Sequence, residues 1–442
     1  YDPVPTAMMP NDDLDLQVLW ACKLDKEWNG VVSRELFAKA WPECIDFPFD
    51  EYGLAIRNIK RGIPAPLCGM YDNWFVDGLG AAIRSELWAC LAPGNPELAA
   101  KFAYEDACVD HAGNGVYAEQ FLAALESQAF VESDLRKLIE TGLACIPAES
   151  ALARAIRDTI AWCENGTPET VRAEIMKHYG SANFTDVKMN LPFMVMALLL
   201  GNGDFGKTIC LAVNCGQDAD CTGATVGAIF GLINPELVSG EWLRPIGRSL
   251  MVSKEVTGIQ APATLDEFTD LVVALKDKVT LKQTPVLPFD LKPFAIRAKR
   301  SVFRPWFAED YRKFKPVPAA DAKEILLPGN LTTVDFTTLP GESLLMLETE
   351  FRLAADRTVR LLVNTPANML VWVDGEFRFG RECGVMVPAF HRAPQNQLAE
   401  LELKAGTHKL VIGLAPASPE MKSAELLFGV ADTRNQWIPD AF

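Results

Sequence analysis

The sequence predicts a multidomain protein in which an all-α helical bundle is followed by an all-β sandwich or jelly-roll domain. Two observations carry this prediction. Apolar residues recur at helical spacing from Asp12 to about Val279, whereas the later part of the chain holds short runs in which apolar and polar residues alternate. The 442 residues suffice for two domains with cores of their own, since a domain typically holds about 100–200 residues. We therefore expect a helical domain over residues 1–283, a connector over 284–318 and a β-sandwich over 319–442.

The first helix begins after an acidic stretch, which suits a helix N-terminus because that end carries a partial positive charge. Leu16, Leu19 and Leu24 follow at helical spacing. Pro, Gly and Asn residues separate the helices that we expect downstream. These helices are Glu97–Val109, Val116–Gln128, Glu132–Ile146, Leu152–Glu164 and Pro168–Tyr179.

A later helix, which follows Asp220, carries glycine at every fourth position, namely Gly223, Gly227 and Gly231. Residues at this spacing lie on one face of a helix. Each glycine inside a helix costs roughly 1 kcal/mol relative to alanine. We expect this face to pack closely against another helix, which would offset the cost and fix the start of the helix.

The C-terminal part is expected to consist of strands, because prolines in the connector argue against a long helix there. The Asp374-Gly375 step between two apolar runs is typical of a hairpin turn, and Trp372 before it is expected in the core. The expected strands are Leu331–Phe336, Leu344–Leu353, Thr358–Asn364, Met369–Asp374, Leu398–Leu403, His408–Leu414 and Glu425–Val430. The basic and aromatic segment Lys292–Lys315 is interpreted as a connector that packs its aromatic side chains rather than as an anion-binding patch.

Composition narrows the classes of function. The formal net charge of -16 argues against a general binder of nucleic acid or anionic membranes, and no stretch is long and apolar enough to span a bilayer. The eleven cysteines are odd in number and lack the paired CxxC spacing of a zinc site. They favour a reducing compartment such as the cytoplasm, while a secreted or periplasmic location stays open because a leader segment can precede Tyr1.

The most informative residues are two pairs of aspartates, Asp12 with Asp13 and Asp218 with Asp220, each at the start of an apolar helix. Carboxylates this close together repel one another unless a cation lies between them, and hard cations such as Mg²⁺ and Ca²⁺ prefer oxygen ligands. If the two pairs meet in the fold, they form a magnesium-type site. The alternative for either pair alone is helix capping beside a solvated loop.

Four segments of the chain form a set with a characteristic order. They are Asn11-Asp12-Asp13, Gly78-Leu79-Gly80-Ala81-Ala82-Ile83-Arg84, Asp110-His111-Ala112-Gly113-Asn114-Gly115 and Asp218-Ala219-Asp220-Cys221. They resemble the Thr-Asp-Asp, Gly-Asn-Gly-(small)₂-Met-Arg, Thr-His and Asp-Thr-Asp-Thr segments of the ADP-ribosylglycohydrolase family, which includes the dinitrogenase-reductase-activating glycohydrolases and the J1-type crystallins. The resemblance covers roughly residues 8–235.

The resemblance implies an all-α fold that holds two Mg²⁺ ions, with Mn²⁺ or Ca²⁺ as alternatives, and hydrolysis of an N- or O-glycosidic bond at a ribosyl or related sugar. The implied metal ligands are Asp12, Asp13, Asp218 and Asp220. One of them, Asp13 or otherwise Asp12, would also accept the proton of the attacking water. The expected substrate contacts are Gly78, Gly80, His111, Asn114, Gly115 and Asn190. The expected partner is a small-molecule or conjugated glycosidic substrate.

Some of these residues have structural alternatives. His111 also fits a hydrogen-bonded structural histidine at a helix end, and Asn190 also fits a helix cap. Arg84 and Glu86, on a helix expected to be buried, are interpreted as an internal ion pair rather than as catalysts.

The chain also departs from the family's motifs, which places it in a divergent branch. Asn11 and Cys221 stand where the family has metal-ligating threonines, and Ala219 replaces the threonine between the two late aspartates. A thiol is a poor ligand for Mg²⁺. Asp15 is an extra carboxylate that could compensate.

Two alternatives to an ADP-ribosyl substrate stay open. The expected C-terminal domain resembles the galactose-binding-like sandwiches appended to many glycosidases, which favours a carbohydrate-active hydrolase on other glycosides. The second alternative is a non-catalytic, crystallin-like or binding relative. Retention of all four aspartates argues against it, since a scaffold has no need to keep repelling charges together.

Overall fold

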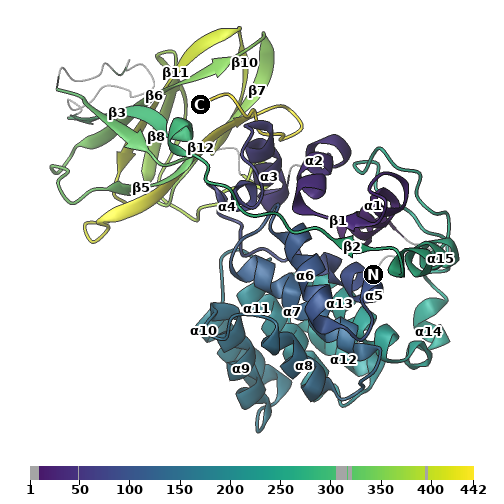
Figure 1. Cartoon of the computed structure of the whole chain (residues 1–442). Coiled ribbons are helices and arrows are strands. Elements are labelled where there is room, and N and C mark those ends of the chain that lie inside the picture. Colours follow the sequence, from purple (N-terminus) through teal and green to yellow (C-terminus); the bar gives the residue numbers. More distant parts are fainter. Residues whose placement is uncertain (1–8, 48, 305–315, 317–320, 394–396) are drawn as a thin grey trace. The chain divides into compact units, whose positions relative to one another are not determined.

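The structure is a computed structural model that describes residues 9–47, 49–304, 316, 321–393 and 397–442 (Figure 1). The described residues form two compact units. The first comprises the chain up to Phe47 together with Ile63–Val286, and the second comprises Pro48–Gly62 together with Leu287–Phe442. Each unit is considered by itself below.

The first unit is built almost entirely from helices, which confirms the helical prediction for this part of the chain. The five helices expected between residues 97 and 179 are all present, with ends within about three residues of the expected ones. The longer helices are α1 (Asp12–Lys26), α2 (Arg34–Cys44), α6 (Pro96–Ala107), α7 (Asn114–Ala129), α8 (Leu135–Ala144), α9 (Ala151–Cys163), α10 (Pro168–Tyr179), α11 (Val187–Leu200), α12 (Phe205–Asn214), α13 (Ala219–Ile233) and α15 (Leu265–Lys276). The shorter ones are α4 (Leu67–Met70), η1 (Ala82–Arg84), α5 (Ser85–Leu91), η2 (Pro235–Leu237) and α14 (Gly240–Leu243).

The first unit has a hydrophobic core shared by several helices, and a short sheet joins segments from near its two ends. Helices α7, α8, α9, α11 and α13 contribute to one hydrophobic cluster, in which Phe121, Met194 and Ile229 are fully buried. The short strands β1 (Val31–Val32) and β2 (Thr280–Leu281) pair in parallel, so the chain after α15 returns to the region that follows α1.

The glycine face of α13 packs as closely as expected at Gly223, and an added Cβ at Gly227 would make an ordinary van der Waals contact. A Cβ added at Gly223 would lie 2.9 Å from Cγ2 of Val213, and one at Gly227 would lie 3.5 Å from Cδ1 of Ile209. Both neighbours belong to α12, so this helix packs close to α13 and holds its first turn. The expectation was wrong for Gly231, whose Cβ would meet no atom of the described residues within 4 Å.

The second unit contains two antiparallel sheets, which confirms the prediction of an all-β domain (Figure 1). One sheet has the strand order β10-β7-β12-β5 and the other has the order β4-β3-β6-β11-β8-β9. One hydrophobic cluster contains side chains from both sheets, including Leu361 and Phe428 from the first and Leu347 and Ile412 from the second. The strands are β3 (Ile296–Phe303), β4 (Lys323–Leu327), β5 (Leu331–Asp335), β6 (Leu344–Leu353), β7 (Arg357–Asn364), β8 (Asn368–Val373), β9 (Glu376–Arg381), β10 (Leu398–Leu403), β11 (Gly406–Ala415) and β12 (Ser423–Ala431).

The hairpin between β8 and β9 follows the expected turn chemistry. Asp374 and Gly375 have φ values of 54° and 80°, and a two-residue hairpin turn of this type needs positive φ at both positions. Trp372 is fully buried and packs edge-to-face against Phe377, with the ring centroids 5.9 Å apart. Its predicted place in the core is therefore confirmed.

Two segments of the second unit lie outside the expected β-domain. The expected connector supplies β3, which pairs with β4 and β6 within the six-stranded sheet. Helix α3 (Asp50–Lys60) comes from the stretch assigned to the helical domain, yet its Arg57 is buried and donates a 3.0 Å hydrogen bond to Oδ1 of Asn330. The guanidinium of Arg57 also lies 5.0 Å from the ring centroid of Trp437. Residues 305–315 of the basic and aromatic segment lie outside the described residues.

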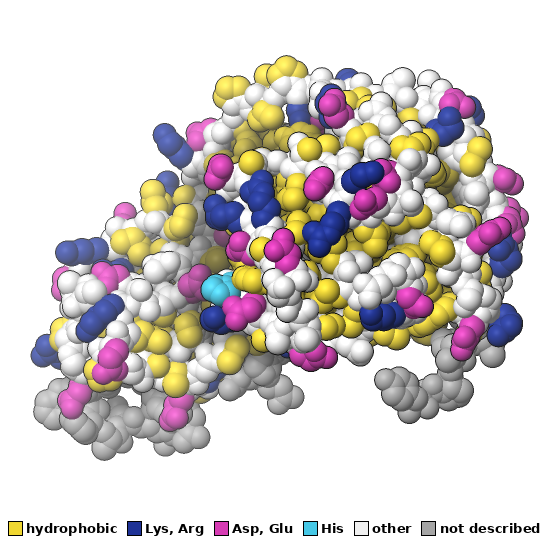
Figure 2. All heavy atoms as spheres, turned by 90° about the horizontal axis from the view of Figure 1, so that it is seen from below, with side chains coloured by type: hydrophobic (Ala, Val, Ile, Leu, Met, Phe, Trp, Pro, Cys, Tyr) yellow, Lys and Arg dark blue, Asp and Glu magenta, His cyan; other side chains and the backbone are white. Residues whose placement is uncertain are grey.

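The surface mixes charges of both signs with exposed hydrophobic side chains. On the face drawn in Figure 2, acidic and basic side chains are interspersed rather than gathered into a region of one sign. Among the described residues, no helix combines the length and the apolar character needed to cross a membrane.

Candidate functional site

The start of α1 places two carboxylates in a helical turn without using either as the cap. Asn11 is the N-cap residue, and its Oδ1 accepts the backbone N–H of Asp13 at 2.8 Å. Asparagine is among the best capping residues because its side-chain oxygen satisfies an otherwise free helix N–H. The side chains of Asp12 and Asp13 are therefore not needed for this capping bond. The capping explanation for this cluster applies to Asn11 instead.

The start of α13 is arranged differently, and its N-cap residue Asp218 makes no side-chain capping bond. Asp218 is buried, and its backbone N–H donates a 3.4 Å hydrogen bond to Oδ1 of Asn190. The amide nitrogen of Asn190 donates in turn to the carbonyl oxygens of Phe184 and Asp186, at 2.8 and 3.0 Å. Asn190, which was expected to contact substrate, thus joins α11 to the first residue of the second aspartate motif.

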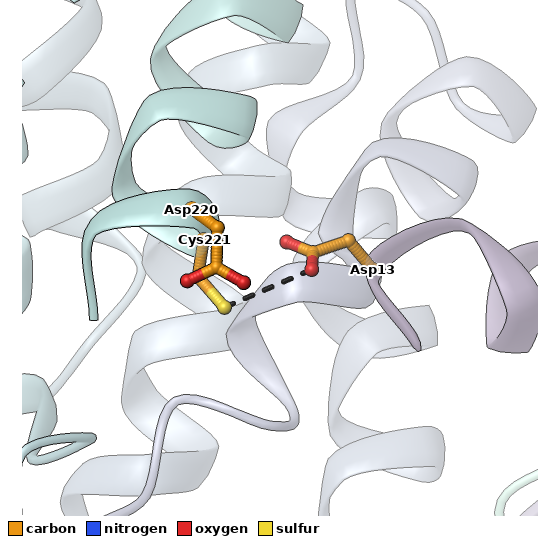
Figure 3. Close-up of side chains that lie close together, drawn as sticks. All are labelled: Asp13, Asp220 and Cys221. Atoms are coloured by element: carbon orange, nitrogen blue, oxygen red, sulfur yellow. Dashed lines mark hydrogen bonds between the residues drawn. The ribbon is translucent and has the colours of Figure 1, made fainter. Parts of the chain in front are cut away.

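The fold brings the two motifs together. One ligand atom each from Asp13, Asp220 and Cys221 lie within 4.8 Å of one another, and Sγ of Cys221 lies 3.7 Å from Oδ2 of Asp13. Figure 3 shows the Asp13 carboxylate, carried by α1, and the Cys221 sulfur, carried by α13, pointing toward one another. Asp220 is exposed, Asp13 is half-buried and Cys221 is buried, so the cluster opens to solvent on the Asp220 side.

The other two aspartates stand close enough to act on this cluster electrostatically. Burial raises the pKa of Asp13 well above its usual range, and the negative charges of Asp12, Glu86, Asp220 and Asp218 raise it further. Burial likewise raises the pKa of Asp218 to about 7; a hydrogen bond with Cys221 opposes this rise, whereas Asp220 and Asp12 add to it. All four aspartates of the two motifs therefore share one region of strongly negative potential.

A cation fits this arrangement. Oδ1 of Asp13 is buried and accepts no hydrogen bond from the described part of the chain. An unsatisfied buried carboxylate oxygen is costly, and a bound cation is a common remedy. The carboxylates of Asp13 and Asp220 supply oxygen donors of the kind that hard divalent cations prefer. The thiol of Cys221 is the one donor in the cluster that Mg²⁺ does not favour.

Two further polar residues border the site: Gln17, which was not singled out from the sequence, and Glu86, which was expected only in an ion pair with Arg84. The side-chain amide of Gln17 donates 2.9 Å hydrogen bonds to the carbonyl oxygen of Asp13 and to Oε2 of Glu86. Burial raises the pKa of Glu86 to about 8, opposed by hydrogen bonds from its own backbone and from Gln17. Gln17 lies four positions after Asp13, which places it on the same face of α1 and was an available signal.

The extra carboxylate of Asp15 does not join the cluster. Asp15 is fully buried, and its Oδ1 accepts the backbone N–H of Ser253 at 3.1 Å. Residues two positions apart on a helix point to different sides, so Asp15 and Asp13 cannot face the same ligand. The expectation that Asp15 compensates for the substituted threonines was therefore wrong.

Three of the expected substrate residues, Gly80, His111 and Gly115, lie in or beside a buried charge network. Arg84 donates to Asp106 at 2.9 Å and to both carboxylate oxygens of Asp110 at 3.0 Å. Its Nη1 also donates to the carbonyl oxygen of Gly80, at 2.9 Å. The expected ion pair of Arg84 with Glu86 was therefore wrong, because Asp106 and Asp110 are the partners.

His111 and Gly115 complete this network. Nδ1 of the fully buried His111 lies 3.2 Å from Oδ2 of Asp110. A Cβ added at Gly115 would lie 2.1 Å from the carbonyl oxygen of Val76 and 2.8 Å from the His111 ring. These contacts fit the structural alternative for His111, and they show that Gly115 is required for close packing.

The remaining expected substrate residues have contacts of their own. Asn114 accepts the backbone N–H of Leu152 at 3.1 Å through Oδ1 and donates to Oδ1 of Asp77 at 3.4 Å. Asp77 also pairs with Lys188. Gly78 is buried and donates its backbone N–H to the carbonyl oxygen of Phe75 at 2.8 Å.

Comparisons with solved structures return weak similarities. A structure described as an ADP-ribosylglycohydrolase-related protein complex aligns with 63% of this chain and 88% of its own, at 19% identity and a TM-score of 0.40. A β-glucosidase from Kluyveromyces marxianus in complex with glucose aligns with 31% of this chain and 15% of its own length, at 10% identity and a TM-score of 0.21. A 4-O-methyl-α-glucuronidase with specificity for decorated arabinogalactans aligns with 76% of this chain and 41% of its own, at 12% identity and a TM-score of 0.17. Because every TM-score is below 0.5, none of these alignments bears on function.

The family comparison is decisive by contrast. None of the curated proteins matches the chain. The family model of the ADP-ribosylglycohydrolases matches residues 3–276, which is more than half of the 442 residues and contains both aspartate motifs. Membership supports a hydrolase with a glycohydrolase-type activity. The chain belongs to the ADP-ribosylglycohydrolase family.

Proposed function

We propose that the protein is a Mg²⁺-dependent glycohydrolase that cleaves an N- or O-glycosidic bond at a ribosyl or related sugar. The convergence of the two aspartate motifs is the observation that carries this proposal. Asp13 and Asp220 come from distant segments, and their carboxylates meet at a point where a buried oxygen of Asp13 accepts no hydrogen bond from any described residue. Family membership supports the hydrolase class, and the oxygen-rich donor set favours a divalent cation.

The four aspartates would divide the chemistry between them. Asp12, Asp13, Asp218 and Asp220 would hold one or two cations, which lower the pKa of a bound water and orient sugar hydroxyls when present. Asp13, or otherwise Asp12, would accept the proton of the attacking water. As the water oxygen bonds to the anomeric carbon, the glycosidic bond breaks, and the leaving nitrogen or oxygen keeps the bonding electron pair and takes up a proton from solvent.

The carboxylate arrangement argues against a purely structural relative. Like charges held together destabilise a fold unless a bound cation compensates for them, and a scaffold gains nothing from that cost. The second alternative, a carbohydrate-active hydrolase on glycosides other than ADP-ribosyl conjugates, uses the same site. It differs only in the substrate, so a substrate panel separates it from the leading proposal.

Cation binding is the first test. The chelator-treated protein is titrated with MgCl₂ and then with MnCl₂, and binding is followed by calorimetry and by thermal melting. A cation that binds only the folded state at 100 times its Kd stabilises the protein by about 2.7 kcal/mol. We expect the Asp13→Asn and Asp220→Asn variants to lose this gain, and the exposed control Asp270→Asn to keep it.

Substrate turnover is the second test. ADP-ribosylated arginine and serine conjugates are compared with nitrophenyl glycosides, with and without MgCl₂, and the released sugar is quantified. Turnover of a conjugate that needs the cation and Asp13 would support the proposal. Turnover of simple glycosides alone would favour the carbohydrate-active alternative. A protein that binds no divalent cation would refute the proposal and leave the non-catalytic relative.

A further inference from the structure

The thiol of Cys221 is an uncommon neighbour for a set of carboxylates that would bind Mg²⁺. Cys221 lies in the first turn of α13, three positions after Asp218, and its side chain is buried toward Asp13. Its Sγ, an oxygen of Asp13 and an oxygen of Asp220 are mutually within 4.8 Å (Figure 3). The sulfur is therefore placed as a third donor of the same cluster rather than as a side chain that only packs nearby.

The separation between Sγ of Cys221 and Oδ2 of Asp13 matches the geometry of a thiolate-containing cation site. Zinc lies about 2.3 Å from a thiolate sulfur and about 2.0–2.2 Å from a carboxylate oxygen, so these two donors stand about 3.6 Å apart around a tetrahedral ion. Sγ of Cys221 and Oδ2 of Asp13 are 3.7 Å apart. Little movement would be needed for both atoms to contact one ion.

A hydrogen bond from the thiol to Asp13 is the simpler reading of this distance, but it leaves the other carboxylate oxygen unexplained. Oδ1 of Asp13 is buried and receives no hydrogen bond from the described residues. A weak S–H donor on one oxygen does not offset the burial of the second. A cation between Asp13, Asp220 and Cys221 would act on the carboxylate as a whole and satisfy the cluster.

We propose that Cys221 is a thiolate ligand that shifts the cation preference of this site from Mg²⁺ toward a borderline ion of the Zn²⁺ class. The inference rests on the proposed function, because it requires that the aspartates hold a cation. Oxygen-only sites suit Mg²⁺, Ca²⁺ and Mn²⁺, whereas thiolates select softer ions such as Zn²⁺. Binding replaces the S–H bond by a sulfur–metal bond, and the released proton passes to solvent.

Cobalt(II) is the probe that tests this assignment, because it replaces zinc and reports its ligands by absorption. The chelator-treated full chain is titrated with CoCl₂, and the near-ultraviolet band that a thiolate–Co²⁺ bond produces is recorded. We expect the intensity of the wild-type band to rise with the number of bound ions until the sites are full. The band should be absent in Cys221→Ser. The control Cys210→Ser, which removes an exposed thiol of α12, is expected to keep the band.

Competition between cations gives a second reading of the same site. We expect Cys221→Ser to weaken Zn²⁺ binding by at least about tenfold, the lower bound for disturbing even an outer partner of a metal ligand. Its Mg²⁺ affinity should change by less than that, so the Zn²⁺-to-Mg²⁺ preference falls. Cys221→Thr restores the family's oxygen donor and should shift the preference in the same direction, which covers the case in which the serine variant does not fold.

The outcomes separate this inference from the proposed function. If Asp13→Asn abolishes cation binding while wild type shows no thiolate band and Cys221→Ser keeps the same preference, the cation site stands and the assignment of Cys221 falls. If wild type binds no divalent cation, the proposed function and this inference fall together. A thiolate band that survives in Cys221→Ser also overturns the assignment.

Discussion

Gln17 donates a hydrogen bond of 2.9 Å to Oε2 of Glu86 and links this acid to the helix that carries Asp13. The same amide nitrogen lies 2.9 Å from the carbonyl oxygen of Asp13 and 3.2 Å from that of Ile83. One side chain therefore fixes the first turn of α1 against η1 and α5. Glu86 is among the groups that raise the pKa of Asp13. By holding Glu86, Gln17 helps to set the distance between Glu86 and the cluster.

Replacing Gln17 with leucine should loosen this arrangement. The variant Gln17→Leu keeps the size of the side chain but leaves Glu86 without its donor, so we expect a loss of about 1–2 kcal/mol in the free energy of unfolding. Cation binding should weaken as well, because Asp13 loses support. Urea titration and calorimetry measure the two effects. The matched control is Gln120→Leu on α7, which loses a single bond to the carbonyl of Ala100 and should leave cation binding unchanged.

Glu86 gives the stability of the cation-free protein a pH dependence. Its pKa is raised from 4.5 to about 8, so the folded state holds its proton more tightly than the unfolded state does. This contribution to stability is complete below pH 4.5 and is lost as the pH rises through 8. In chelator, the melting temperature of wild type should fall across this window, and Glu86→Gln should fall less. If the melting temperatures of the two proteins fall equally with pH, the pKa of Glu86 is not raised in the folded state.

The periodicity of the sequence predicted the helices and strands better than it predicted which unit each of them belongs to. The strands β5 to β12 other than β9 were expected within three residues of their ends, since alternation along the sequence reports burial of one face directly. Helix α3 could not be assigned to the second unit, because that grouping depends on pairs such as Arg57 and Asn330, which are 273 positions apart. No local pattern reports such a contact.

The candidate site, too, could be predicted only in part from the sequence. The aspartate motifs could be found because their composition is unusual and their order matches a family. Arg84 and Glu86 were wrongly paired with each other, since both lie on one short stretch and only the fold shows that Arg84 faces Asp106 while Glu86 faces Gln17. The misplacement of Asp15 was avoidable, because helix geometry already turns it away from Asp13.

Gly115 and Gly231 should respond in opposite ways to the same substitution. A Cβ at Gly115 would lie 2.1 Å from a backbone oxygen of Val76, which cannot move aside cheaply, so Gly115→Ala should destabilise the protein by about 1–3 kcal/mol or more. Gly231 lies inside α13 with open space around its Cα, and Gly231→Ala should stabilise the helix by up to about 1 kcal/mol. Denaturant titration of both variants checks the pair. A stable Gly115→Ala protein would contradict the packing described around His111.

Arg84 is expected to contribute strongly to the stability of the first unit. It is fully buried and faces Asp106 and Asp110, while Glu119 lies 4.0 Å from its Nη2. Burial alone would raise the pKa of Asp110, but the charges of Arg84 and His111 outweigh it and hold the pKa below its usual value. Removing Arg84 would therefore leave the ionised carboxylate of Asp110 in the core without its guanidinium partner.

We expect Arg84→Met to lower the free energy of unfolding by about 3–5 kcal/mol, the range for breaking a buried ion pair by removing one partner. The double variant Arg84→Met with Asp110→Asn should recover part of this loss, since the stranded charge is then removed together with its partner. Arg84→Lys should not substitute, because an ammonium cannot bond Asp106 and both oxygens of Asp110 in one planar fork. Urea unfolding of the single and double variants gives the coupling energy. Additive losses would show that Arg84 and Asp110 act independently, despite the two 3.0 Å hydrogen bonds between them.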